Sequence, residues 1–208
     1  ISDTTSLAYQ LNAYLTHHQV DPNALYILWG GANDIGRAIR ENPDPAEATK
    51  AAAKDIVNLA AKLEAEGAKH VLVINMPDIA LAPAYRDNPH AKLFTSLSVL
   101  FNTTLQSEID EQKLDVKVYN EFDAGRKIFS TVQDRGSFVY KDLTLTDVTS
   151  ELCQDHGAIE CDKPMSPDNP GRPPYLANTD GSGHPTDIGH RILAGQLFDF
   201  ISSDKFRE

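Results

Sequence analysis

The sequence predicts an α/β fold in which a parallel sheet is covered by helices on both faces. Short segments that are apolar throughout alternate with longer segments in which apolar residues recur every three or four positions. The short segments are typical of strands buried on both faces, and the longer ones are typical of amphipathic helices. Alternation of the two along the chain predicts a three-layer α/β/α arrangement.

The first elements follow this pattern. Residues 5–19 place leucines and a tyrosine at helical spacing, which predicts an amphipathic helix. Residues 24–29 are apolar throughout and end at two glycines, which predicts a buried strand. A long helix is predicted to begin near Pro45, a residue suited to the first helical turn, and to end at Gly67.

The rest of the chain continues the alternation and closes on a helix. In chain order we expect a strand at 70–75, a helix at 90–112, a strand at 116–119, a helical segment at 124–135, an irregular loop at 150–182 and a helix at 186–202. The loop is rich in Pro, Gly and Asp, and long loops of this kind often carry function. Because three parallel strands make a thin sheet for this class, we expect that N-terminal strands are missing from this chain.

Length and charge limit the possible functions. The chain of 208 residues is long enough for a single domain with a sizeable core. It carries 19 Lys and Arg against 30 Asp and Glu, a net charge of −11, without a basic cluster. Such an acidic chain is poorly suited to nucleic acid, so no nucleic-acid partner is expected. Its apolar runs are all far shorter than the roughly 20 residues that span a bilayer.

Two cysteines lie in the irregular loop. Cys153 and Cys161 do not form a CxxC pair, and His156 beside them does not complete a zinc site. We predict a local disulfide, which favours an oxidising compartment, and the alternative is two free thiols. Ile1 is not an initiator residue, and no signal pattern follows it, so the chain is expected to be processed or excised from a longer one.

One candidate for chemistry follows the first predicted strand. Gly30 and Gly31 would let the backbone approach a ligand closely, and Asn33 would present a neutral amide donor there. A neutral donor stabilises an oxyanion that forms transiently. The alternative is a turn that ends the strand, in which Asn33 and Asp34 make local hydrogen bonds.

A second candidate precedes the last predicted helix. His184 lies in a glycine-rich loop, with Asp180 upstream and Pro185 suited to the first turn of the helix. A histidine and a carboxylate are the parts of a general base and the group that orients it. The alternative is an exposed loop histidine beside a capping aspartate.

Together the two segments resemble the GDSL, or SGNH, family of serine esterases and lipases. In that family a GxND block follows a central strand and a DxxHP block lies near the C-terminus. Here the first block is matched by residues 31–34 and the second by 184–186. The order and spacing of these blocks, the 73–78 segment and the paired cysteines are most similar to the esterase (passenger) domain of bacterial autotransporter proteins.

The resemblance implies a fold and an extent. It implies the flavodoxin-like parallel sheet of SGNH hydrolases, with residues 1–208 forming the C-terminal two thirds of a single domain. The family's Gly-Asp-Ser block, which carries the nucleophile, is absent here. We therefore expect a companion N-terminal segment with that serine, either cleaved but bound or missing altogether. An extracellular, periplasmic or outer-membrane-surface location is also implied.

The resemblance also implies a site. Within it, His184 is the general base, Asp180 orients the imidazole and Asn33 is an oxyanion donor. The substrate-binding residues would be Gly31, Ala32, Met76 and Pro185, with neither cofactor nor metal. Asp180 lies four residues before the histidine, where the family has three, and Gly181 takes the usual place. Asp187, Asp168 or a Ser–His dyad are the alternatives.

The expected activity is hydrolysis of a carboxylic ester, fatty-acyl or aryl, through an acyl-enzyme. Two alternatives remain at this point. One is a non-catalytic relative or fragment that binds a ligand or a partner. The other is a related acyltransferase, which would pass the same acyl group to an alcohol other than water.

Overall fold

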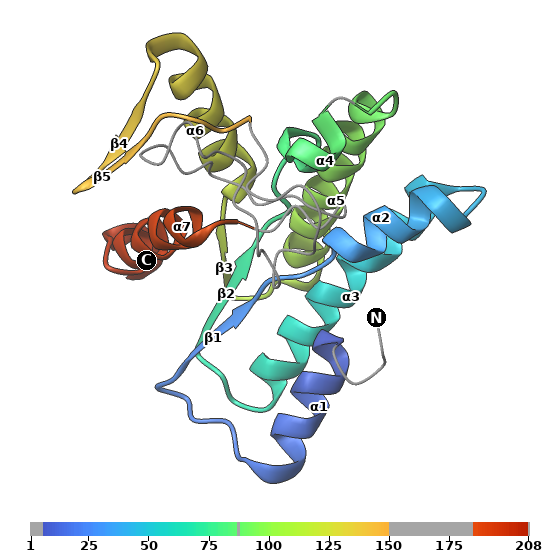
Figure 1. The fold of residues 1–208 in the computed structure, drawn as a ribbon. Coiled ribbons are helices and arrows are strands. Elements are labelled where there is room, and N and C mark those ends of the chain that lie inside the picture. The colour runs from blue at the N-terminus through green and yellow to red at the C-terminus, as the bar shows by residue number, and fades with distance from the viewer. Residues whose placement is uncertain (1–5, 87, 150–184, 208) are drawn as a thin grey trace. The chain divides into compact units, whose positions relative to one another are not determined.

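The structure is a computed structural model that describes residues 6–86, 88–149 and 185–207 (Figure 1). Contacts divide the chain into two compact units. The first unit comprises Ile1–Pro77 and Ser96–Glu121, and the second comprises Asp78–Thr95 and Phe122–Glu208. Each unit is described by itself below. The prediction that residues 1–208 form one domain stays a prediction.

The first unit contains a parallel sheet of three strands. Its strands are β1 (Leu25–Leu28), β2 (His70–Ile74) and β3 (Val116–Tyr119), in that order across the sheet. In the register, Leu28 pairs with Val73, and Ile74 pairs with Tyr119. Because all three strands run the same way, their carboxyl ends share one edge. The predicted α/β fold with a parallel sheet is confirmed.

The first unit also contains four helices. They are α1 (Leu7–His17), α2 (Ala32–Glu41), α3 (Pro45–Ala65) and most of α5 (Ala91–Gln112), whose first residues belong to the second unit. Local signals set the ends of α3. The Asp44 side chain accepts hydrogen bonds from the Ala46 and Glu47 amides, and the helix is followed by the left-handed Gly67, as predicted.

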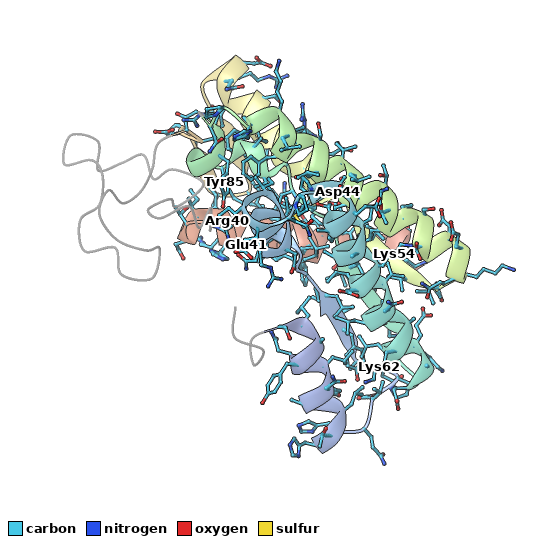
Figure 2. All side chains as sticks on the ribbon, turned by 90° about the vertical axis from the view of Figure 1, so that its right-hand side faces the viewer. Arg40, Glu41, Asp44, Lys54, Lys62 and Tyr85 are labelled. Carbon is cyan, nitrogen blue, oxygen red and sulfur yellow. The ribbon has the colours of Figure 1, made fainter. Side chains whose placement is uncertain are left out.

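The helices of the first unit are joined at their surfaces as well as in the core. Two lysines of α3, Lys54 and Lys62, take part in these contacts (Figure 2). Lys54 pairs with Glu108 of α5 at 2.9 Å, and Lys62 donates to Asn12 of α1 at 2.7 Å. Most buried side chains of this unit come from α2, α3, α5 and β2, and that of Met76 comes from the loop after β2. They include Ile35, Ala38, Ala53, Ile56, Val57, Ala60, Leu63, Val71, Leu72, Val73, Ile74, Met76, Leu97, Phe101, Leu105 and Ile109.

Two features of the first unit differ from the sequence-based expectation. The strand β1 is less buried than predicted: Leu25 is 37% and Ile27 is 47% exposed. The reason is its place, because β1 is an edge strand and pairs with β2 alone among the described residues. The helix α2 was not predicted, and it is stabilised by burying Ile35 and Ala38.

The second unit is a helical cluster with a small hairpin. Its elements are η2 (Ile79–Leu81), α4 (Pro83–Arg86), α6 (Glu121–Arg135) from its second residue, β4 (Phe138–Tyr140), β5 (Leu143–Leu145), α7 (Asp187–Ile201) and α8 (Asp204–Arg207). The strands β4 and β5 pair antiparallel, and this hairpin was not predicted. The buried core comprises Ala82, Ile128, Phe129, Val132, Leu145, Val148 and Ile192.

The hairpin of the second unit is joined to α7 by polar contacts. Tyr140 donates to Asp199 at 2.7 Å, and Lys141 pairs with the same carboxylate at 2.9 Å. At its other end α7 is capped by Thr186, whose hydroxyl accepts from the Gly189 amide at 3.4 Å. In the part of the chain that the structure describes, no helix combines the length and the apolar character that crossing a membrane requires.

Candidate active site

The segment after β1 forms a tight turn that opens directly into α2. Gly31 is the N-cap of this helix and adopts a left-handed conformation, with φ of 105° and ψ of −19°. Its carbonyl accepts hydrogen bonds from the amides of Asp34 at 3.0 Å and Ile35 at 3.1 Å. The turn therefore fixes the direction in which the first residues of α2 leave the sheet.

Two side chains pack directly on Gly31. A Cβ atom at this position would lie 2.6 Å from Phe101 Cε2 and 2.9 Å from Met76 Cε. Both distances are shorter than real Cβ contacts, so any side chain here would displace its neighbours. The positive φ disfavours other residues independently. Both the close packing and the positive φ therefore favour glycine at this position.

Asn33 lies in the first turn of α2, two residues after the glycine. Its side chain is exposed, and it makes no hydrogen bond to any other described residue. The first N–H groups of a helix have no partners within the helix and carry the positive end of its dipole. An exposed amide donor beside such N–H groups is chemically suited to stabilising a negative oxygen.

The loop after β2 is held by an asparagine of α5. The Met76 amide donates to Asn102 Oδ1 at 2.7 Å, and Asn102 Nδ2 donates to the Met76 carbonyl at 2.8 Å. One carboxamide therefore satisfies both polar groups of the same residue. Met76 is only 1% exposed, so its side chain packs beneath the Gly31 turn rather than at the surface.

Polar side chains also meet at the ends of β2 and β3. Asn75 Nδ2 donates to Asn120 Oδ1 at 3.1 Å, and the Asn75 amide donates to the Tyr119 carbonyl at 3.0 Å. These residues directly follow their strands. Because β2 and β3 are parallel neighbours, the residues that follow them lie at the same edge of the sheet, and the hydrogen bond between the two asparagines agrees with that.

Glu121, the next residue after Asn120, is a buried acid. It is 5% exposed, and its Oε2 has no hydrogen-bond partner among the described residues. Burial penalises the charged carboxylate and raises the pKa of Glu121 to about 7, from an ordinary value of 4.5. At neutral pH this carboxyl group therefore carries a proton for much of the time.

The second unit begins with another buried acid, which has partners. The Asp78 side chain is 2% exposed and accepts from Arg126 at 2.7 Å, from the Thr95 hydroxyl at 2.8 Å and from the Ala80 amide at 3.3 Å. Arg126 also lies over the Phe122 ring, 5.4 Å from its centroid. These contacts hold the start of η2 against α5 and α6 and place Asp78 in a structural role.

The structure describes some of the predicted site residues and not others. Gly31, Ala32 and Asn33 lie together at the start of α2, and the buried Met76 lies beneath them. Asp180, His184, Cys153 and Cys161 lie outside the described residues, as does the alternative Asp168. Their roles, and the meeting of Asn33 with His184, stay predictions.

Pro185 does not lie in the first turn of the last helix, where the sequence predicts it. The helix α7 begins at Asp187 and has Thr186 as its N-cap, so Pro185 precedes the cap instead of lying in the first turn. Thr186 caps the helix with its hydroxyl, which accepts from the Gly189 amide. Further along the helix, a ring nitrogen of His190 lies 3.0 Å from the Thr186 carbonyl oxygen, a local contact at the helix start.

Sequence reasoning missed two residues of α5 that support this region. Phe101 lies within the helix predicted at 90–112, but its contact with Gly31 does not follow from the sequence. Asn102 was not singled out. Its half-buried place beside the fully buried Phe101 becomes apparent only in the fold, so nothing in the sequence alone marks it as a residue that needs a partner.

Comparison with known proteins points to one family. The profile of the GDSL-like lipase/acylhydrolase family matches residues 1–197. The chain is 26% identical over 185 residues to a Pseudomonas putida protein named "Uncharacterized protein in trpE-trpG intergenic region", covering 89% of this chain and 30% of that protein. It is 28% identical over 100 residues to the phosphatidylcholine-sterol acyltransferase of Aeromonas hydrophila, covering 48% of this chain and 29% of that protein.

The extent of these matches has two consequences. The chain spans less than a third of the length of each of these two relatives. The family match, in contrast, covers nearly all of the chain and agrees with the parallel α/β architecture of the first unit. The chain belongs to the GDSL-like lipase/acylhydrolase family.

Proposed function

We propose that this chain is the part of a serine carboxylester hydrolase that carries the oxyanion donor and the general base. Membership in an acylhydrolase family supports ester chemistry. The observation that carries the proposal is the position of Asn33. Its side chain is exposed in the first turn of α2, behind a left-handed glycine at the carboxyl end of β1. Ligands of parallel α/β proteins bind beyond this edge of the sheet.

The proposed reaction proceeds through an acyl-enzyme in two halves. A serine hydroxyl attacks the ester carbonyl carbon while His184 accepts its proton, and Asn33 donates to the resulting oxyanion. The tetrahedral intermediate collapses, and the alcohol leaves with the proton from His184. Water then attacks the acyl-enzyme with His184 as base, which releases the acid and regenerates the serine. Asp180 holds the imidazole in the required tautomer throughout.

The neutral amide of Asn33 suits its proposed role for an electrostatic reason. It stabilises negative charge on the carbonyl oxygen as that charge develops, without holding a permanent counter-ion in the resting site. The N–H groups at the start of α2 would reinforce it. Loss of one such donor typically lowers turnover by about 100- to 1,000-fold.

The nucleophile is proposed to come from a companion segment that precedes this chain. The edge strand β1 supports this, because its outer edge has no strand beside it among the described residues. Leu25 and Ile27 on the same strand are also unusually exposed for apolar side chains. A further parallel strand at this edge would pair the free backbone groups, and its carboxyl end would lie beside Asn33.

Substrate and location are part of the same proposal. The substrate is a fatty-acyl or aryl ester, and the protein acts outside the cytoplasm, in the periplasm, at the outer-membrane surface or beyond it. The predicted disulfide between Cys153 and Cys161 fits an oxidising compartment. Alkylation of the unreduced protein checks this point by mass, because a disulfide leaves both sulfur atoms unmodified.

One observation favours a second function, acyl transfer to an alcohol. A relative that matches about half of this chain is named as an acyltransferase. Such an enzyme would form the same acyl-enzyme and differ only in what accepts the acyl group. Product analysis in the presence of a competing alcohol separates the two, since a transferase yields a new ester where a hydrolase yields the free acid.

The experiment that tests the proposal is labelling with a fluorophosphonate, which reacts with activated serines. The complete protein should carry the label on the segment that bears the nucleophile, and H184A should abolish it. The control H190A changes an exposed histidine of α7 and should leave labelling intact. Equal labelling of H184A and the unchanged protein contradicts the proposed base. A complete protein that takes no label supports the non-catalytic alternative.

A further inference from the structure

The side chain of Asn102 makes an unusual pair of contacts within the first unit. It accepts from the Met76 amide at 2.7 Å and donates to the Met76 carbonyl at 2.8 Å, across 26 positions of sequence. A carboxamide has one donor and one acceptor side by side, whereas a carboxylate only accepts and an aliphatic side chain does neither. Asn102 therefore fixes the Met76 backbone in position and in orientation.

The side chain of Met76 packs against the Gly31 turn, so the position of Met76 affects that of the turn. Met76 is 1% exposed, and a Cβ atom built on Gly31 would lie 2.9 Å from its Cε atom. Phe101, the neighbour of Asn102 in α5, packs on the same glycine, and a Cβ built there would lie only 2.6 Å from its ring. One turn of α5 thus both packs on Gly31 and holds the second residue that packs on it.

The Gly31 turn in turn determines where Asn33 points. Gly31 is the N-cap of α2 and accepts the first hydrogen bonds of that helix. Asn33 is two residues further along, in a helical turn whose direction follows from the cap. Close-packed contacts transmit small displacements, so a shift of Met76 moves the turn and the amide that follows it.

We propose that Asn102 is a positioning residue for the amide of Asn33, acting through Met76 and Gly31. The role rests on the proposed function, in which Asn33 is the oxyanion donor. Asn102 itself touches neither substrate nor reacting atoms. Its contribution is to keep the donor within the small tolerance that transition-state stabilisation requires, because a misplacement of about 1 Å can cost roughly 100-fold in rate.

The test combines N102L with N33A in a double-mutant cycle on the complete protein, with kcat and KM measured for a p-nitrophenyl ester. N102L should lower kcat by about 10- to 100-fold with KM nearly unchanged. In the N33A background the same change should lower kcat by less than about twofold, since the group it positions is gone. An equal loss of kcat in both backgrounds overturns the proposal.

Two further variants separate positioning from folding. N102L removes both hydrogen bonds, and N102D keeps an acceptor for the Met76 amide but turns a carboxylate oxygen toward the Met76 carbonyl, so both variants should lower kcat. T103A alters the next residue, whose exposed hydroxyl bonds only within α5, and should leave kcat unchanged. An N102D variant with the kcat of the unchanged protein contradicts the role of the bond that Asn102 donates to the Met76 carbonyl.

An activity-independent measurement distinguishes failure of this inference from failure of the proposed function. The side-chain amide resonances of Asn33 and the Gly31 backbone resonance should shift in N102L and stay in place in T103A. If N33A leaves kcat unchanged, the oxyanion role is wrong, yet these shifts still report the mechanical link. Resonances of Asn33 that do not move in N102L overturn the inference whatever the activity.

Discussion

The ring of Phe101 closes over the backbone of Gly31 so tightly that a single added methyl group would lie 2.6 Å from its edge. The two residues come from α5 and from the turn after β1, which are distant in sequence. Their contact brings the only left-handed N-cap glycine of the described helices against the core of the first unit. Substitutions at this contact and near it should therefore change the free energy of unfolding and the rate of catalysis.

The first prediction concerns G31A. The alanine backbone must adopt a left-handed conformation, which costs about 1–2 kcal/mol. Its methyl group also overlaps Phe101 and Met76, which adds about 1–3 kcal/mol. The free energy of unfolding in urea should therefore fall by more than that of G67A. Gly67 is the matched control, because its φ is also positive, at 102°, and a Cβ there meets nothing within 4 Å. Equal losses in the two variants would falsify the close packing.

The second prediction concerns Asp78. D78N keeps the shape of the side chain but places an amide where Arg126 donates, and it weakens the bond to the Thr95 hydroxyl. Because the Asp78 carboxylate is buried, we expect a loss of about 1–3 kcal/mol in the free energy of unfolding, measured in urea at neutral pH.

The control for this variant is an exposed pair of the same chemistry. Asp34 and Arg37 lie 2.7 Å apart with side chains that are 41% and 54% exposed. Solvent screens such a pair, so D34N should change stability by less than about 0.5 kcal/mol. A D78N variant as stable as D34N would show that burial of Asp78 does not strengthen its contacts.

The sequence was most informative where a long periodic pattern met a clear end signal. The helix α3 was predicted from its apolar spacing, Pro45 and Gly67, and α5 from apolar residues on one face. The buried strand β2 followed from the apolar run at 71–74 within the predicted strand at 70–75. In each case the local signal and the tertiary environment agree, because Val71, Leu72 and Val73 are all within 1% of complete burial.

Elements that depend on tertiary contacts escaped the same reasoning. The helix α2 has Gly36 and several polar residues, and its stability comes from burying Ile35 against the rest of the first unit. The hairpin strands have three residues each, too few for a period-two pattern. The bonds from Asn102 to Met76 required the fold itself, since nothing in the local sequence shows that α5 passes the loop after β2.

The third prediction concerns catalysis. If Asn33 donates to the oxyanion, N33A should lower kcat for ester hydrolysis by about 100- to 1,000-fold and change KM little, because the interaction forms in the transition state. N42A is the control, an exposed asparagine that caps the other end of α2. It should retain full turnover. A rise in KM at unchanged kcat would assign Asn33 to substrate binding instead.

The fourth prediction concerns the buried acid Glu121. Its pKa is raised by burial to about 7, above the ordinary 4.5 of an unfolded chain. Between these pH values the native state holds a proton that the unfolded state has released, so raising the pH destabilises the fold. The contribution is complete below the lower value and lost above the higher one. At about 1.4 kcal/mol per pKa unit, the loss totals about 3 kcal/mol.

The variant E121Q isolates this contribution, because a glutamine side chain stays neutral at every pH. The free energy of unfolding of the unchanged protein, minus that of E121Q, should fall as the pH rises from 4.5 to about 7 and then level off. Carbon NMR of the Glu121 carboxyl group should give a midpoint near the upper value. A difference that stays flat over this range, together with an ordinary midpoint, would mean that water or another group reaches Glu121 and stabilises its charge.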